Sequence, residues 1–328
     1  MSEIFAAPGN AGMAETALTL DIRATDFPAL TRAVEEKRID LVVVGPEDPL
    51  AAGIVDHFKK IGIAAFGPDR LAAQLEASKV FSKGLLQKYH IPCAASASFS
   101  DLASARRYAA ARGAPLWIKA DGLAAGKGAV FAGSLNEADE ILSSMMESRI
   151  FGASGETVVI EDQLVGREMS AFAITDGITI VPAVPACDYK RVYDGDRGPN
   201  TGGMGCYTPP SFLTAELEEK VQSVVMGPVV RAMAKEGRPY RGVLYGGLMI
   251  NNGEPSVIEF NARFGDPECQ VILPRLKTDL LDLVLGTVNG NLDTVQVSWS
   301  DEACVGVALA SGGYPGKYQT GFPITGLN

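Results

Sequence analysis

The sequence predicts a protein of mixed α/β and α+β class with more than one domain. Near the N-terminus, short apolar strands alternate with amphipathic helices, a pattern typical of a parallel sheet covered on both faces. Further along, two apolar runs flank the turn Asn252-Gly253, which is typical of an antiparallel hairpin. At 328 residues, the chain is long enough for two or three domains.

The composition argues against nucleic acid and membrane as partners. Apolar residues make up 47% of the chain, and a net charge of −10 would repel the phosphates of a nucleic acid. No apolar run is long enough to cross a bilayer, and the N-terminus shows no signal peptide. Five scattered cysteines without a CxxC pair indicate a reducing cytoplasm. Only two histidines are present, which argues against Ser-His-Asp catalysis and histidine-rich metal sites.

The first 68 residues are expected to form the parallel sheet. Strands are predicted over 4–7, 40–44 and 63–66, and helices over 27–37 (capped by Asp26) and 52–61. Ligands of such sheets bind beyond the carboxyl ends of the strands, where Pro8-Gly9-Asn10 and Gly45-Pro46-Glu47 follow. These two segments are therefore candidate binding loops, although plain turns explain them as well.

Residues 69–113 are expected to be helical, with one helix over 72–89 and a second over 102–111. The first helix carries Lys79, Lys83 and Lys88. From the pattern alone, these lysines are expected to be solvated.

A glycine-rich hairpin is predicted next, with strands over 115–119 and 129–132. The connection Asp121–Gly128 is not a Walker A loop, because Gly follows Lys127 and a strand is predicted to come after it. The backbone N–H groups and lysines of such a flap can close over phosphates. Lys119 lies in an apolar strand, where its charge requires a partner such as a nucleotide phosphate. A plain hairpin with exposed lysines is the alternative.

Two further segments are candidate binding elements. The strand 158–162 ends in carboxylates and returns over 168–174, an arrangement that suits a purine pocket with Glu168 on the ribose, or simply a core strand. The polar connection 188–205 contains Lys190 and Arg191, which suit an anionic substrate. A lid or binding loop is favoured there over a solvated loop.

The segment Val257–Val271 (VIEFNARFGDPECQV) is the richest in candidate chemistry. Glu259 and Asn261 are two apart on a strand, so their oxygens share a face and suit a hard cation such as Mg²⁺ or Mn²⁺. Arg263 follows directly, and a guanidinium beside a metal is what phosphoryl transfer demands. An edge strand with a solvated Glu and Asn is the alternative.

The remaining elements frame this segment. A helix pair is predicted over 213–235 with a break at Gly227-Pro228, and a strand over 242–251 is expected to pair with 256–261. A helix over 276–288 and a strand over 304–310 complete the chain.

Several motifs resemble the phosphoribosylamine–glycine ligase family of ATP-grasp enzymes, over essentially the whole chain. They are PGNAG (8–12), GPE (45–47), IKADGLAAGKG (118–128), GPNTGGMG (198–205) and RFGDPECQV (263–271). The last two are the most specific to that family. The resemblance implies ATP-dependent ligation of glycine to 5-phosphoribosylamine through glycyl phosphate, a step of purine biosynthesis.

The resemblance also implies an ATP-grasp fold preceded by a parallel-sheet, Rossmann-like N-terminal domain. We expect the N-terminal domain over 1–75, and the ATP-grasp domain over 76–302 with a flap subdomain over about 94–165. Residues 303–328 would begin an incomplete C-terminal domain. A monomer is expected.

Carried over position by position, the resemblance implies a set of site residues. The nucleotide-binding candidates are Lys79, Lys119, Gly126, Lys127, Gly128, Glu161, Asp162, Leu164 and Glu168. The implied metal ligands are Glu259 and Asn261, and the implied catalytic residues are Arg263 and Lys127. The substrate-binding candidates are Asn10, Glu47, Asp188, Lys190, Arg191, Asn200, Thr201, Gly202 and Arg263.

Two departures from the family pattern leave alternatives open. The chain lacks the first strand and its phosphate-binding loop, and it stops where the C-terminal domain would begin. It could therefore be a fragment that holds ATP without ligating. A related ATP-grasp ligase or carboxylase acting on another purine intermediate is the other alternative, against which GPNTGGMG and RFGDPE argue.

Overall fold

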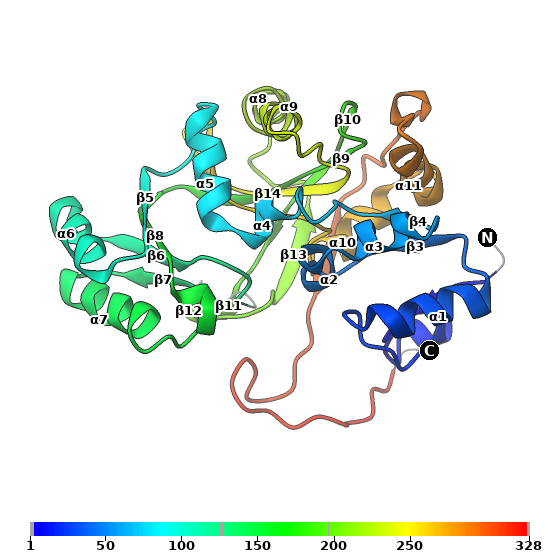
Figure 1. Ribbon diagram of the computed structural model, residues 1–328, viewed down its shortest axis with the longest axis horizontal. Helices are drawn as coiled ribbons and strands as arrows, with labels where there is room; N and C mark the ends of the chain where they lie inside the picture. The colour runs from blue at the N-terminus through cyan, green and yellow to red at the C-terminus, as the bar shows by residue number, and fades with distance from the viewer. Residues whose placement is uncertain (1–2, 125–127, 196, 327–328) are drawn as a thin grey trace.

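A six-stranded antiparallel sheet forms the centre of the computed structural model, which describes residues 3–124, 128–195 and 197–326 (Figure 1). Its strand order is β15-β14-β9-β10-β13-β16. In chain order these strands are β9 (Arg167–Thr175), β10 (Ile180–Asp188), β13 (Gly205–Thr208), β14 (Gly242–Asn251), β15 (Glu254–Asn261) and β16 (Cys304–Val307). The predicted pairing of β14 with β15 is confirmed. Asn252 and Gly253 make the turn with φ of 51° and 77°, the left-handed values that a tight hairpin needs.

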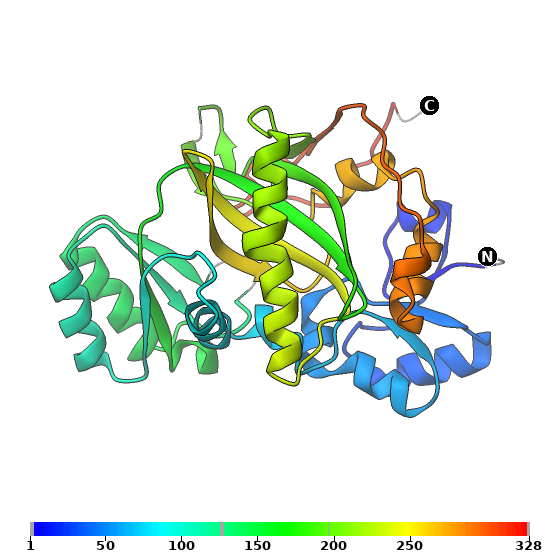
Figure 2. The same cartoon turned by 90° about the horizontal axis from the view of Figure 1, so that it is seen from above.

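One long helical rod lies across a face of this sheet (Figure 2). It consists of α8 (Ala215–Val221), a π-helical stretch (Gln222–Met226) and α9 (Gly227–Lys235), so the predicted break at Gly227-Pro228 is wrong. The π turn precedes Pro228, which lies in the first turn of α9, where its missing N–H costs little. The rod therefore stays continuous and buries apolar side chains of α9 in the main core.

A second sheet of four antiparallel strands forms the flap unit, at the left of Figure 1. Its order is β5-β8-β6-β7, from β5 (Ser96–Phe99), β6 (Leu116–Ala120), β7 (Ala129–Ala132) and β8 (Val158–Asp162). Helices α6 (Leu102–Arg112) and α7 (Leu135–Met146) pack on it around a separate core. The structure thus confirms the glycine-rich hairpin, while β5, with its weak Ser-Ala-Ser-Phe pattern, was not predicted.

The predicted helix over 72–89 is divided in two. The short α4 (Gln74–Ala77) ends at Ser78, which has an extended backbone and caps α5 (Lys79–Lys88): its side-chain Oγ accepts a hydrogen bond from Phe81 N at 3.0 Å. A serine at this position favours the N-cap conformation over continuation of the helix. Lys79 is thereby placed at the first position of α5.

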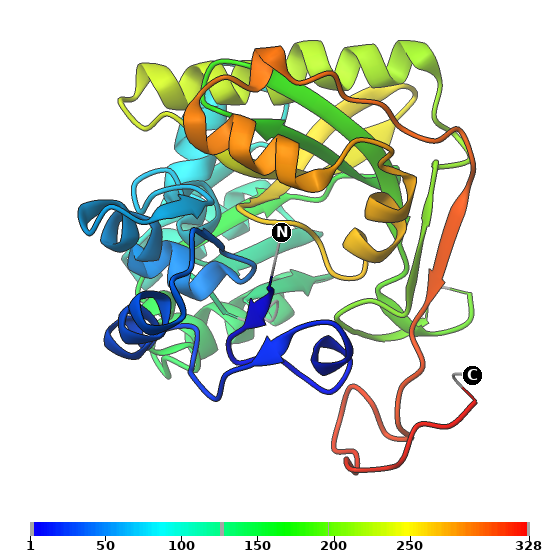
Figure 3. The ribbon, with the colours of Figure 1, turned by 90° about the vertical axis from the view of Figure 1, so that its right-hand side faces the viewer.

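The C-terminal segment docks on the body through β16, which pairs with β13 at the edge of the central sheet (Figure 3). It follows α10 (Cys269–Ile272), the 3₁₀ turns Leu273–Arg275 and Leu292–Thr294, and α11 (Leu280–Asn289). The helix predicted over 276–288 begins later, because Asp279 caps it through Leu281 N. Val305 and Val307 remain 71% and 74% exposed, and the described residues after β16 form neither helix nor strand.

The N-terminal part contains the three predicted strands, but not as one sheet: they form two separate parallel pairs, together with an unpredicted strand at Leu18–Thr19. β1 (Phe5–Ala6) pairs with β2 (Leu18–Thr19), and β3 (Leu41–Val43) pairs with β4 (Ala64–Phe66). Between β1 and β2 lies the 3₁₀ turn Met13–Glu15. No helix in the described ranges is long and apolar enough to span a membrane.

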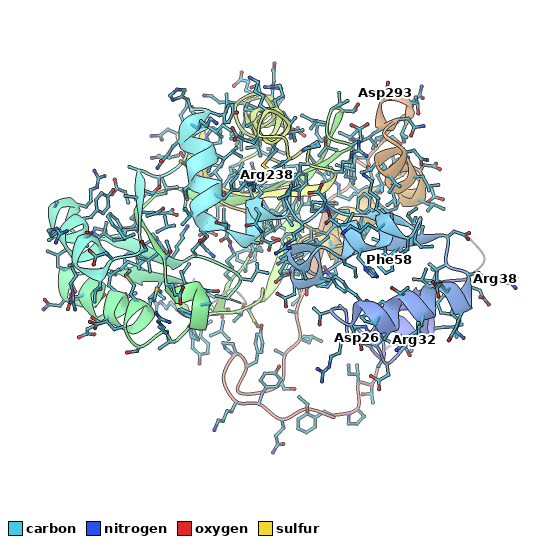
Figure 4. All side chains as sticks on the ribbon, in the orientation of Figure 1. Asp26, Arg32, Arg38, Phe58, Arg238 and Asp293 are labelled. Carbon is cyan, nitrogen blue, oxygen red and sulfur yellow. The ribbon has the colours of Figure 1, made fainter. Side chains whose placement is uncertain are left out.

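The helices of this part follow their local sequence. Asp26 and Arg38 lie at opposite ends of α1 (Phe27–Lys37), and Asp26 caps the helix as predicted (Figure 4). The predicted helix over 52–61 is wrong at its start: α2 (Glu47–Ala52) begins earlier, and α3 (Ile54–Lys60) follows a break at Gly53. Gly53 has φ of 90°, a left-handed value that glycine adopts without strain and that ends α2.

The contribution of the flap core to the stability of the flap unit can be tested by substitution. Leu142 of α7 is fully buried in that core, whereas Leu135 of the same helix is 43% exposed. Leu142→Ala is expected to cost about 2–5 kcal/mol of folding free energy, because it leaves a cavity. Amide hydrogen exchange in β6 and β8 should then accelerate. The matched variant Leu135→Ala should leave those rates nearly unchanged; equal effects of both variants would contradict the assigned core.

Candidate active site

Three elements meet at one buried carboxylate, that of Glu161 on β8. Its Oε2 lies 2.9 Å from Lys83 Nζ on α5 and 3.1 Å from Lys119 Nζ on β6. Both ammonium groups also donate to the Ile258 carbonyl of β15 at 3.3 Å. All three charged side chains are almost fully buried, and Glu161 Oε1 has no hydrogen-bond partner among the described residues. The flap sheet, α5 and the central sheet are therefore joined at one charged point.

A second set of contacts ties the start of the flap loop to α5. The Asp121 carboxylate accepts hydrogen bonds from Ser78 Oγ and Val80 N, both at 3.1 Å. Lys79 Nζ donates to the Gly122 carbonyl at 3.1 Å. Burial lowers the pKa of Lys79, although the Glu259 carboxylate opposes this effect. The ammonium of Lys79 is thus held beside the loop that carries the glycine-rich motif.

The predicted metal pair lies next to this lysine cluster. Glu259 and Asn261 stand on the same face of β15, on either side of the buried Phe260. Desolvation of Glu259 by the residues packed around it opposes ionisation, but four surrounding lysines outweigh it and lower the pKa of this carboxyl. Its side chain still reaches solvent, so the carboxylate is ionised and open to a ligand.

The donor set fits a divalent cation only together with further oxygens. The described residues contain no group of three or more His, Cys, Asp or Glu that could hold a metal ion by themselves. A carboxylate and an amide oxygen are hard ligands, and the phosphates of a nucleotide supply the rest of such a coordination sphere in many enzymes. The lysines likewise suit the phosphates of such a nucleotide, and Glu161 Oε1, which has no partner among the described residues, could accept a hydrogen bond from one of its N–H or O–H groups.

A pocket beside Glu259 gathers further charges. It is lined by Glu168, Asp188, Lys190, Tyr245 and Glu259, among others. Lys190 Nζ lies 3.2 Å from Glu168 Oε2 and 3.9 Å from Asp188 Oδ2. Burial raises the pKa of Asp188 to about 6 although Lys190 opposes the shift, and the carboxylates of Asp188 and Glu168 raise the pKa of Lys190 against the effect of its own burial. This pocket is therefore lined by several carboxylates around one lysine.

The polar connection 188–205 is more regular than predicted. It contains the hairpin of β11 (Arg191–Tyr193) and β12 (Arg197–Asn200) and then β13. Thr201 fixes Lys190 by donating to its carbonyl through both N and Oγ1, at 2.7 and 2.9 Å. The backbone of the GPNTGGMG motif thus sets the position from which Lys190 reaches the pocket.

Below the pocket lies a buried polar network that the sequence analysis did not find. Glu268 Oε1 accepts hydrogen bonds from Ser170 Oγ at 3.0 Å and Tyr245 Oη at 2.7 Å. Burial raises the pKa of Tyr245 well above its usual value, so the phenol stays protonated and donates. Glu268 is also the N-cap residue of α10, so the RFGDPE motif connects the pocket floor to that helix.

Arg263 connects the two halves of the chain. Its Nε lies 2.8 Å from Glu47 Oε2 at the start of α2, and its Nη2 lies 3.7 Å from Glu76 Oε1. Glu76 Oε2 accepts a hydrogen bond from Ala262 N at 2.7 Å. Burial raises the pKa of Glu76 to about 7, with Arg263 opposing the shift. The GPE motif thus meets the RFGDPE motif through one ion pair.

Four other predicted site residues make their hydrogen bonds or ion pairs away from the lysine cluster and the pocket. Asn10 Oδ1 accepts from Met13 N and so closes its own turn, and Asp162 pairs with Arg112 on the outer side of the flap. Arg191 donates to the Gly198 carbonyl within its hairpin, and Gly202 N donates to Tyr314 Oη of the C-terminal segment.

Three more candidates are placed without a side-chain contact to this cluster. Leu164 lies between β8 and β9, Asn200 is exposed at the end of β12, and Gly128 bonds to Ala120 N at the start of β7. Gly126 and Lys127 lie outside the described residues.

Two family models match the chain in succession. Residues 1–76 match the phosphoribosylglycinamide synthetase N domain, and residues 77–269 match the ATP-grasp (A) domain of the same synthetase. The chain belongs to the phosphoribosylglycinamide synthetase family. Its fold is that of the ATP-grasp enzymes, with the parallel strands of the N-terminal part before it.

Individual members of the family cover most of the chain. A phosphoribosylamine–glycine ligase of Vibrio cholerae is 47% identical over 99% of this chain and 76% of its own length. One of Mesorhizobium japonicum is 48% identical over 100% and 77%. The crystal structure of the Thermotoga maritima phosphoribosylamine–glycine ligase superposes with a TM-score of 0.84 at 32% identity, covering 97% of this chain and 76% of that one.

Within this family fold, one prediction about the lysines of α5 is wrong. Lys88 is exposed, as expected, and pairs with Glu236 at 2.6 Å. Lys83 is only 4% exposed, because α5 packs this side chain between β8 and β15. Lys83 follows Lys79 by four residues and so lies on the same face of the helix, but this spacing alone does not show that the face is buried.

Glu76 makes chain stability depend on pH. A glutamate whose pKa rises from 4.5 to about 7 on folding stabilises the folded state in its protonated form. That contribution, of about 3 kcal/mol, is complete below pH 4.5 and is lost as the pH rises toward 7. Glu76→Gln keeps an acceptor for Ala262 N and is expected to flatten the decline of the melting temperature across this range. The exposed Glu254→Gln should retain the wild-type slope; a Glu76→Gln variant with that same slope would refute the assignment.

Proposed function

We propose that the chain ligates glycine to 5-phosphoribosylamine at the expense of ATP, giving glycinamide ribonucleotide, ADP and phosphate. The observation that carries the proposal is the convergence of Lys79, Lys83, Lys119 and Lys190 around Glu259 on β15. Family membership supports the reaction, since the relatives named above are phosphoribosylamine–glycine ligases. Such an array neutralises phosphates without any side-chain nucleophile.

We assign the residues around the cluster to two tasks, binding of the nucleotide and binding of the metal. We assign the ATP phosphates to Lys79 and Lys119, together with Gly126, Lys127 and Gly128 of the glycine-rich loop. We assign the adenine to the segment 161–164 and the ribose hydroxyls to Glu168. Glu259 and Asn261 would hold Mg²⁺ or Mn²⁺, which supplies neutralisation of phosphate charge when bound. Asp162 would contribute through its backbone, because its side chain turns to Arg112.

The chemistry then proceeds in two steps. A carboxylate oxygen of glycine attacks the γ-phosphorus of ATP, so that a new O–P bond forms and ADP leaves. The amine nitrogen of phosphoribosylamine next attacks the carbonyl carbon of glycyl phosphate, expels phosphate and loses a proton. Arg263, held by Glu47, is assigned to the developing charge on the acyl phosphate. Positioning and charge neutralisation account for both steps.

The substrate-binding surface extends from this point over the neighbouring loops. Besides Arg263 and Glu47, we assign to it the pocket residues Asp188 and Lys190 and the loop that supports them. The remaining members are Asn10, Arg191, Asn200, Thr201 and Gly202. Five free thiols suit work in a reducing compartment, and we place the activity in the cytoplasm with a monomeric enzyme.

The proposal is tested by following ADP release and product mass with purified chain, Mg-ATP, glycine and freshly prepared phosphoribosylamine. ADP release that requires both glycine and phosphoribosylamine, with formation of glycinamide ribonucleotide, is the expected result. A chain that binds ATP but releases no ADP under these conditions would instead be a nucleotide-binding form without ligase activity. ADP release that depends on a different carboxylate would point to another ATP-grasp reaction.

Glu259 gives the sharpest single test of the metal assignment. Glu259→Ala removes the carboxylate from the ligand pair and is expected to lower kcat by at least about 100-fold, on the scale of losing one preorganised charge-stabilising group. Glu254→Ala is the matched control, since Glu254 lies on the same strand, is exposed and pairs with Lys220. Both variants should keep the wild-type circular dichroism spectrum. Retained turnover in Glu259→Ala would refute the assignment.

A further inference from the structure

The cluster at Glu161 holds one more positive charge than its carboxylate requires. Lys83 and Lys119 both contact the same oxygen, Oε2, at 2.9 and 3.1 Å, and both share the Ile258 carbonyl. The side chains of Lys83, Lys119 and Glu161 are at most 5% exposed, so water cannot screen the three charges. A single lysine would balance the carboxylate, and the second is a surplus cation in a dry site.

The two lysines differ in where they can go. Lys119 is the next-to-last residue of β6, and the strand runs directly into the glycine-rich connection that begins at Asp121. Lys83 stands in the middle of α5, one turn after Lys79, and packs against β8. Lys119 is thus the one next to the phosphate-binding loop, whereas Lys83 is fixed behind it.

We infer that Lys83 is a positioning residue, the permanent counter-ion of Glu161 that frees Lys119 to bind nucleotide phosphate. Without Lys83, any move of Lys119 toward phosphate would leave a buried carboxylate without a partner, which is strongly unfavourable. With Lys83 in place, Glu161 stays paired while Lys119 exchanges one anion for another. The inference rests on the proposed function, and it adds a residue to which the family resemblance assigned no role.

A structural role alone does not require this arrangement. Burial lowers the pKa of Lys83, and the Glu161 carboxylate 2.9 Å away opposes this shift, so an ammonium group at this position is costly to keep. An apolar side chain would join α5 to β8 without that cost. A second lysine on the same helix, Lys88, reaches solvent and pairs with Glu236, so α5 itself places no requirement on buried charge.

The experiment measures the Kd of the full chain for a non-hydrolysable ATP analogue with Mg²⁺, by titration calorimetry. Lys83→Met is expected to raise Kd at least about tenfold, because Lys119 is then held by Glu161 alone. Lys88→Met, on the same helix, should leave Kd unchanged. An unchanged Kd in a folded Lys83→Met variant would overturn the inference.

A second variant shows whether Lys83 acts through Glu161. In Lys83→Met/Glu161→Gln the competing carboxylate is gone, so Kd should return to within about threefold of Glu161→Gln alone. A double variant that binds no better than Lys83→Met would overturn the inference. If Lys83→Met does not fold, the comparison of the double variant with Glu161→Gln decides: similar Kd values support the inference, and weaker binding by the double variant overturns it.

Steady-state kinetics separate this role from a general loss of structure. In Lys83→Met, the KM for ATP should rise while the KM for glycine stays at its wild-type value, because only the nucleotide loses its lysine. A parallel rise of both values would indicate a structural role and overturn the inference. A wild-type chain that binds no nucleotide at all would overturn the proposed function itself, and the two failures are therefore distinguishable.

Discussion

Ion pairing at Glu161 is the contact on which the arrangement of the site depends. Glu161 lies on β8, and two elements distant in the sequence, α5 and β6, reach it with lysines that also donate to the Ile258 carbonyl of β15. A buried carboxylate must be paired, and a buried ammonium must find acceptors, so each element is held at a defined place by the others. The flap sheet, which has its own core, is thereby oriented against the central sheet at the point where the nucleotide is proposed to bind.

The local charges around the site matter more than the net charge of the chain. The chain as a whole carries −10, yet four lysines surround Glu259 and lower the pKa of its carboxyl. Carboxylates in turn surround Lys190 and raise its pKa. Carboxylates and lysines alternate at short range. An acidic protein can therefore present both an ionised carboxylate for a metal and several lysines to one anionic molecule.

The Arg263–Glu47 ion pair gives the fold a second constraint. It joins the loop after β15 to the first residue of α2, and Glu76 completes it from α4. Two motifs more than 200 residues apart, GPE and RFGDPE, are thus parts of one contact. The N-terminal part is therefore attached to the site by the same residues that are proposed to meet the substrate.

The sequence by itself determined those structural features that depend only on residues close together along the chain. The Asp26 cap, the Asn252-Gly253 hairpin, the glycine-rich flap and the shared face of Glu259 and Asn261 all follow from local spacing, and the structure contains each of them. Only the tertiary structure decided which charges are buried and with whom they pair. Lys83 and Lys88 look alike on one helix, and the continuous rod through Gly227-Pro228 is stabilised by the sheet beneath it. Burial depends on packing between elements far apart in sequence, and no local pattern records that packing.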